Sequence, residues 1–139
     1  MVKIRVFKKS DSKSVIKLWK DCFAYYSSPH NKPEISLKVK LKHKDGLLFI
    51  AAEGSAIVGS VMAGFDGHRG WIYSMAVTPE YRTKGLGSRL LKHAEKELKK
   101  RGAPKINLQV MPDNEGVVKF YEKNGYNVEP RISMGKRLK

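Results

Sequence analysis

The stretch that decides the fold is Met75-Ala76-Val77-Thr78-Pro79-Glu80-Tyr81-Arg82-Thr83-Lys84-Gly85-Leu86-Gly87. An apolar segment ends at Thr78-Pro79 and a helical pattern starts at Gly85, which predicts a strand, a short loop and a helix. A helix N-terminus has unpaired backbone N–H groups and a partial positive charge, so it suits a phosphate. The two glycines of the motif let a phosphate approach the backbone, and its arginine and lysine add positive charge.

Glycines at a helix start also occur in turns for steric reasons alone, so this loop by itself does not identify a ligand. The Gly-x-x-x-x-Gly-Lys-Ser/Thr pattern of nucleoside-triphosphate sites is absent from the sequence. The third glycine and the early βαβ unit of a dinucleotide fingerprint are absent as well. The sequence therefore disfavours a nucleoside-triphosphate or nicotinamide site.

On the N-terminal side of the loop, alternation and helical spacing predict a strand, a helix, a buried hairpin and a further strand, over residues 2–7, 10–26, 47–65 and 71–77. The capping side chains for the helix would come from Ser10-Asp11-Ser12. Cys22 falls on the buried stripe of this helix, where core packing is the simplest role for a lone cysteine.

The Lys-rich stretch 35–44 is ambiguous. Leu37, Val39 and Leu41 alternate with lysines at a period of two, which favours a strand. The pairs Ile35/Val39 and Leu37/Leu41 also satisfy helical spacing. Periodicity alone therefore leaves both structures open, with the strand ahead.

On the C-terminal side, residues 85–101 predict a helix with one buried stripe made of Leu86, Leu90, Leu91, Ala94 and Leu98. A strand follows over 106–110, then a helix capped by Asp113 or Asn114, and the tail 126–138 would add one or two strands. The element order β-α-(α)-β-β-β-α-β-α-β predicts a mixed α/β sheet. With 139 residues, 41% of them hydrophobic, and no linker or repeat, we expect one domain spanning 1–139.

The stretch 75–87 resembles the core motif of the GNAT superfamily of acyl-CoA N-acyltransferases. A second segment follows in the expected order, because Asn114 leads into Phe120-Tyr121-Glu122-Lys123-Asn124-Gly125-Tyr126, similar to the family's Asn…Phe-Tyr-x-x-x-Gly-Phe/Tyr. The run at 65–70 and the closing Gly135-Lys136-Arg137-Leu138 also look like the YpeA-type bacterial branch. The agreement in element order covers almost the whole chain.

This resemblance implies a GNAT-like mixed, mostly antiparallel sheet, with strands 4 and 5 splayed apart and pantetheine in the gap. It also implies a helix over 35–44. The strand before the loop would hydrogen-bond pantetheine and polarise the thioester, and the loop would hold the pyrophosphate. The implied cofactor-binding residues are Met75, Ala76, Val77, Arg82, Thr83, Lys84, Gly85, Leu86, Gly87, Ser88 and Asn114.

The implied reaction is direct attack of a neutral amine on the thioester of acetyl-CoA. Tyr121 matches the family position for a general acid to the departing thiolate, although a core aromatic on the same helix would fit the pattern too. Several branches carry a carboxylate four residues before the strand valine, where this chain has Tyr73. Asp66, His68 and Glu53 remain as candidate bases, and each also suits a turn or surface position.

Charge is the least explained feature of the sequence. The chain has 28 Lys and Arg against 13 Asp and Glu, a net charge of +15, which favours a polyanionic partner. Coenzyme A would use only a few of these charges. A basic nucleic-acid or ribosome-associated module is the alternative, but the aromatics lie within apolar runs and do not alternate with basic residues as a stacking surface would. A non-catalytic CoA-binding domain is a third possibility.

Other classes of protein are disfavoured by what the sequence lacks. Its four histidines have no metal-ligand spacing and there is one cysteine, so we expect no metal. No apolar stretch is long enough for a signal peptide or a membrane span, and we expect a cytoplasmic protein without a membrane partner. The acceptor would be an amine-bearing small molecule or protein, and neither it nor the oligomeric state can be read from the sequence.

Overall fold

The computed structural model describes residues 1–23 and 29–139. The chain divides into two compact units, Met1–Leu108 and Gln109–Lys139, which are described separately. The family-implied sheet and its flanking helices lie in the first unit.

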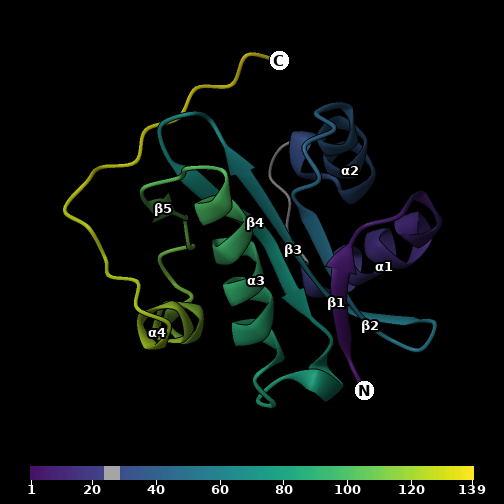
Figure 1. Cartoon of the computed structure of the whole chain (residues 1–139). Helices are drawn as coiled ribbons and strands as arrows, with labels where there is room; N and C mark the ends of the chain where they lie inside the picture. Colours follow the sequence, from purple (N-terminus) through teal and green to yellow (C-terminus); the bar gives the residue numbers. More distant parts are fainter. Residues whose placement is uncertain (24–28) are drawn as a thin grey trace. The chain divides into compact units, whose positions relative to one another are not determined.

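The first unit contains a five-stranded sheet in the order β1-β2-β3-β4-β5, made of Lys3–Val6, Leu48–Glu53, Ala56–Phe65, Gly70–Val77 and Ile106–Asn107 (Figure 1). Neighbouring strands are antiparallel except β4 and β5, which are parallel. This confirms the mixed, mostly antiparallel sheet. The fifth strand is shorter than the predicted 106–110, because its ladder with β4 stops at Asn107.

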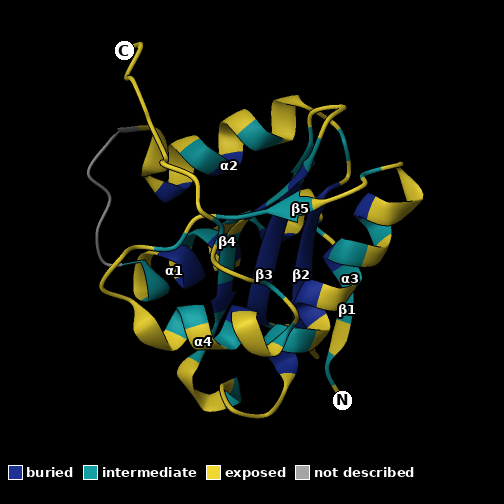
Figure 2. Ribbon diagram, turned by 90° about the vertical axis from the view of Figure 1, so that its left-hand side faces the viewer, coloured by how far each residue is buried: buried dark blue, intermediate teal, exposed yellow. Residues whose placement is uncertain are grey.

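Helices cover both faces of this sheet, as Figure 2 shows. Helix α1 (Ser12–Cys22) packs on β3 and β4, and α3 (Leu86–Lys100) packs on β2, β3 and β4. Successive side chains of a strand point to opposite faces. In β3, a Cβ on Gly59 would lie 2.9 Å from Leu90 of α3, whereas Ser60 contacts Trp19 of α1. The predicted continuation of α1 to Tyr26 falls on residues 24–28, outside the described part.

The core follows the predicted stripe of α3, since Leu86, Leu90, Leu91, Ala94 and Leu98 are all buried. On the other face, a cluster joins α1, α2 and the sheet through residues that include Val15, Trp19, Leu37, Ile50 and Met62. The helical spacing of apolar residues therefore located α1 and α3 correctly.

The ambiguous stretch forms helix α2 (Pro33–Lys42), as the family resemblance implied and the period of two did not. Leu37 is buried at 3% exposure, but Ile35, Val39 and Leu41 are 39–49% exposed. The alternation of apolar residues and lysines predicted a strand wrongly, because it does not mark a buried face. Of these four apolar side chains, one reaches the core.

The capping side chains for α1 were expected from Ser10-Asp11-Ser12; Asp11 stands at the N-cap, but its side chain makes no hydrogen bond to the helix. The carboxylate accepts two hydrogen bonds from Arg5, at 2.8 and 3.0 Å, and one from the Lys8 N–H at 2.8 Å. These bonds, above all the two from Arg5, lower the pKa of Asp11. The residue therefore ties β1 to the start of α1.

The second unit contains α4 (Glu115–Lys123), whose cap is the predicted Asn114: its Oδ1 accepts the Val117 N–H at 3.3 Å. The strands predicted over 126–138 are wrong, since residues 124–139 form neither helix nor strand. Pro130 lacks a backbone donor, and apolar side chains of the tail such as Ile132 and Met134 are about nine-tenths exposed.

No helix in the described ranges is long and apolar enough to cross a membrane.

Candidate functional site

Strand β4 contains a bulge in the segment that the sequence analysis singled out. Ser60 of β3 pairs with Ala76, but Met62, two residues on, pairs with Tyr73, three residues back. Between these two pairs β4 has two residues, Ser74 and Met75, where β3 has one, so β4 carries one extra residue. Ser74 takes a φ of +48°, which is unusual for a residue other than glycine. Such an arrangement re-aims the backbone at this point of the strand.

The other edge of β4 is paired over a short length. Strand β5 pairs with Gly70 and Trp71, and the ladder ends there. From Ile72 to Val77, β4 therefore runs on without β5 beside it, which is the splay that the resemblance implied. A strand edge of this kind can take up an extended ligand through backbone hydrogen bonds. The segment Met75–Val77 lies on this stretch.

The loop after β4 ends in an open helix N-terminus. A short 3₁₀ turn (Pro79–Tyr81) follows the strand, and α3 begins after Gly85, whose φ of +80° favours glycine. No side chain caps this end of α3, and the first helical bond is donated by the Arg89 N–H to the Gly85 carbonyl at 3.1 Å. The N–H groups of residues 86–88 consequently have no acceptor within the helix, which suits an anion.

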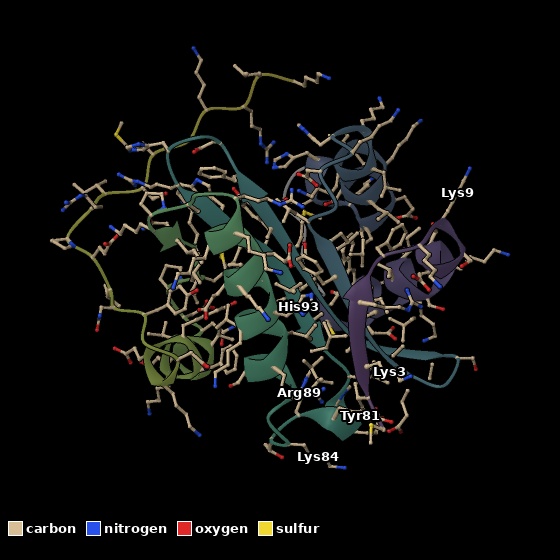
Figure 3. All side chains as sticks on the ribbon, in the orientation of Figure 1. Lys3, Lys9, Tyr81, Lys84, Arg89 and His93 are labelled. Atoms are coloured by element: carbon tan, nitrogen blue, oxygen red, sulfur yellow. The ribbon has the colours of Figure 1, made fainter. Side chains whose placement is uncertain are left out.

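Basic side chains surround this loop, though not all point at its N–H groups. Arg82 Nε donates to the Val77 carbonyl at 2.9 Å, and its guanidinium lies 3.7 Å from Cys22 Sγ. It therefore fastens the loop to β4. Lys84 Nζ lies 5.7 Å from the centre of the Tyr81 ring. Lys84, Tyr81 and Arg89 come together at the loop end of the unit (Figure 3).

A surface hollow of about 390 Å³ lies beside the loop. Its lining combines two carboxylates, two cations and apolar groups: Val2, Glu53, Glu80, Tyr81, Lys84, Leu86 and Arg89.

Cys22 is half-buried and packs against the α1 core cluster, in keeping with its predicted packing role.

Two of the three candidate bases, Asp66 and Glu53, accept hydrogen bonds from other groups, and all three lie toward the strand ends. Asp66 accepts the N–H groups of His68 and Arg69, both at 2.8 Å, and these bonds lower its pKa. His68 is exposed in the same β3–β4 turn, at the end of β4 opposite to Val77. Glu53, at the end of β2, accepts a hydrogen bond from Tyr81, which lowers its pKa. Carboxylates with a lowered pKa are weak bases.

Tyr73, which stands where some branches carry a carboxylate, is half-exposed. Burial of the rest of the side chain, with a smaller contribution from Asp66, raises the pKa of its phenol. Tyr73 therefore stays protonated at neutral pH and cannot replace a carboxylate base. Among the described residues no group of three or more His, Cys, Asp or Glu could hold a metal ion.

In the second unit, Tyr121 is buried at 8% exposure and meets the rings of Phe120 and Tyr126 edge-on, with centroids 5.0 and 5.6 Å away. Burial raises the pKa of Tyr121 to about 12, so the phenol keeps its proton at neutral pH. Both motif residues of this unit are thus held by local structure, Asn114 by its cap to α4 and Tyr121 by its neighbouring rings.

Comparison with known proteins adds a family likeness. Residues 12–126 match the acetyltransferase (GNAT) family. An acetyltransferase of Yersinia enterocolitica is 44% identical over 137 residues, covering 99% of this chain and 96% of the relative. An acetyltransferase of Pectobacterium atrosepticum is 42% identical, with the same coverage.

Solved structures with similar folds include an N-acetyltransferase from Thermoplasma acidophilum in complex with coenzyme A. It is 25% identical, with a TM-score of 0.80, and the match covers 95% of this chain and 93% of that one. The ribosomal-protein-S18-alanine N-acetyltransferase from Escherichia coli shares the fold, with a TM-score of 0.76, 24% identity, and coverage of 91% and 78%.

Proposed function

The chain belongs to the GNAT family of acetyltransferases, and from this premise we propose how it transfers an acetyl group from acetyl-CoA to an amine. N-acetyltransferase activity with acetyl-CoA as donor is the family's chemistry. We propose that residues 1–139 form one acetyltransferase domain, because the family match spans parts of both compact units.

One observation carries the assignment of the donor site: β4 leaves its β5 partner after Trp71 and then runs through a bulge into an open helix N-terminus. The backbone of Met75, Ala76 and Val77 would bind the pantetheine arm as a neighbouring strand would. The N–H groups at the start of α3, with the loop from Arg82 to Ser88, would bind the pyrophosphate. Asn114 would contact the cofactor arm through its side-chain amide.

In the reaction, a neutral amine attacks the thioester carbonyl carbon, the C–N bond forms and the C–S bond breaks. We assign Tyr121 the donation of its O–H to the departing sulfur. Its pKa of about 12 lies well above that of a free thiol, about 8.5. The phenol therefore stabilises the forming thiolate by a hydrogen bond, and the final proton comes from solvent.

The incoming amine must lose a proton before it attacks, since an alkylammonium has a pKa near about 10.4. The three candidate bases, Asp66, His68 and Glu53, lie toward the strand ends. The pKa values of Asp66 and Glu53 are lowered. We therefore propose that the proton leaves through water at the acceptor side and not through a dedicated carboxylate. Activity should then rise with pH across the range in which the acceptor amine deprotonates.

For the acceptor, we propose an amine carried by a molecule of net negative charge. The chain carries a net charge of +15, and the outer face of α2 presents the exposed lysines Lys38 and Lys42. A positive surface raises the local concentration of anionic substrates and repels polyamines. This preference should weaken as salt screens the charges.

The test is a panel of amines incubated with acetyl-CoA while free thiol is followed. The panel contains acidic peptides with free N-termini or lysines, matched neutral peptides, and polyamines, each at low and high ionic strength. We expect the acidic peptides to turn over fastest at low salt and the polyamines slowest. Absence of thiol release with every amine, together with salt-sensitive RNA binding, would favour the nucleic-acid-binding alternative.

A further inference from the structure

A buried hydrogen-bonded chain holds the β4 bulge from the side of α1. Trp19 Nε1 donates to Ser60 Oγ at 2.8 Å, and Ser60 Oγ donates to the Ser74 carbonyl at 3.0 Å. Trp19 and Ser60 are 1% and 0% exposed. Ser60 is the hydroxyl that interrupts the apolar run of β3, and Trp19 lies 41 residues before it.

The chemistry of the three groups fixes the direction of this chain. An indole N–H can only donate and a carbonyl can only accept. The Ser60 hydroxyl must therefore accept from Trp19 and turn its own hydrogen to Ser74. Burial makes each bond costly to lose, because an unsatisfied buried polar group keeps its desolvation penalty. The Ser74 carbonyl is thus held toward β3 although its residue has the strained φ of +48°.

The orientation of this carbonyl determines the orientation of the next N–H. The described chain has no cis peptide, and in a planar trans peptide the C=O and N–H point in opposite directions. The Ser74 carbonyl accepts from Ser60 of β3, so the Met75 N–H points away from that serine. The edge of β4 that faces away from β3 is the one which β5 leaves after Trp71.

We propose that Trp19 and Ser60 are positioning residues for acetyl transfer: by fixing the Ser74–Met75 peptide they aim the Met75 N–H at the thioester carbonyl of acetyl-CoA. The inference rests on the proposed function, which places that thioester beside Met75–Val77. The N–H donates a hydrogen bond to the carbonyl oxygen, which gains negative charge as the amine attacks. Nothing is transferred to or from Trp19 or Ser60.

The test uses acetyl-CoA labelled with ¹³C at the acetyl carbonyl, and follows the carbonyl stretch by difference infrared spectroscopy, which needs no knowledge of the acceptor. A hydrogen bond to the carbonyl lowers this frequency. We expect a lowered band on the wild-type protein, a band returned toward that of free acetyl-CoA on Ser60→Ala, and a smaller return on Trp19→Phe. The affinity for CoA, which lacks the acetyl group, should not change.

The control is Val15→Ala, which removes packing from the same helix and core cluster without touching the chain of hydrogen bonds. It should lower thermal stability and keep the wild-type band. With an acceptor from the panel, Ser60→Ala should lower kcat about 10- to 100-fold with little change in the KM for acetyl-CoA. Ser60→Thr, which keeps the hydroxyl, should restore the band if it folds.

Three results would overturn the inference, and they are distinguishable. If Ser60→Ala binds acetyl-CoA with the wild-type carbonyl band, the hydrogen-bonded chain does not aim the donor, while the proposed function stands. If the wild-type protein binds acetyl-CoA without a lowered band, or does not bind it, the placement of the thioester at the bulge fails as well. A band lost equally in Val15→Ala and Ser60→Ala would assign the effect to packing and also reject the positioning role.

Discussion

Replacing Gly85 by Ala separates the shape of the proposed phosphate-binding loop from its charge. Gly85 has a φ of +80°, and a Cβ built on it would meet nothing within 4 Å. The cost of the substitution is therefore conformational and not steric. An L-residue in this left-handed region costs roughly 1–2 kcal/mol. No basic side chain is altered.

The matched control is Gly102→Ala. Gly102, just after α3, has a φ of +95° and likewise nothing within 4 Å of its Cβ position. Both variants should lose about 1–2 kcal/mol of unfolding free energy if they keep the backbone conformation, a fall in Tm of about 3–6 °C. Where the loop at Gly85 relaxes instead, the ligand must restore its shape on binding. The same 1–2 kcal/mol then appears as a dissociation constant for acetyl-CoA raised about 5- to 30-fold.

Calorimetric titration of both variants with acetyl-CoA, beside their thermal melts, measures the two effects. We expect weaker binding in Gly85→Ala alone, with Gly102→Ala at wild-type affinity. A Gly85→Ala variant that melts and binds like the wild type, or a Gly102→Ala variant that loses as much affinity, would refute the conformational role of Gly85.

Three further predictions concern other parts of the chain. Tyr121→Phe should lower kcat about 10- to 100-fold with little effect on the KM for acetyl-CoA. Because the pKa of Tyr121 is about 12, ionisation of this phenol should not lower the wild-type rate below about pH 10. A fall in the wild-type rate between pH 8 and 10 that is absent from Tyr121→Phe would contradict this. Asp11→Asn should lower the unfolding free energy by about 2 kcal/mol at pH 7. Since the folded-state pKa of Asp11 is lowered, this stability difference should persist above about pH 4 and shrink as the pH falls further. Urea melts of both proteins from pH 7 to 3 measure the difference. Gly59→Val should destabilise more than Gly59→Ala in the same melts, because even a Cβ there lies 2.9 Å from Leu90 and 3.1 Å from the backbone oxygen of Ala76; equal stability of the two variants would show that α3 yields freely.

Much of the fold was predictable because local patterns mark it. The four-residue recurrence from Leu86 to Leu98 located α3 and its buried stripe, and Asn114 marked the start of α4. The period of two in α2 failed, because exposed apolar side chains such as Val39 imitate a strand when lysines lie between them. The tail failed because alternation without a pairing partner does not make a strand.

The site was predictable in part. The glycine loop was visible because the residues proposed to bind the pyrophosphate are adjacent in the sequence. The bulge was not, because the extra residue at Ser74 exists only relative to the register with β3. A serine inside the apolar run 56–65 was the available signal for Ser60, but its partner Trp19 is distant in the sequence and could not be read from it.

The general base also could not be settled by residue type. Asp66 is a carboxylate in a plausible region of the sequence, and the structure commits it to the β3–β4 turn through two backbone N–H groups. The chain has Tyr73 where a carboxylate could have stood, and this phenol stays protonated. The proton path from the acceptor amine is therefore assigned to water.

The most direct test of the account is the calorimetric titration of acetyl-CoA into the wild-type protein and into Gly87→Glu. The substitution places a carboxylate in the first turn of α3, where the unpaired N–H groups are proposed to hold the pyrophosphate. We predict saturable one-to-one binding to the wild type, and no measurable binding to a Gly87→Glu variant whose circular dichroism and melting show it to be folded. Tight binding of acetyl-CoA by that folded variant would contradict the central claim.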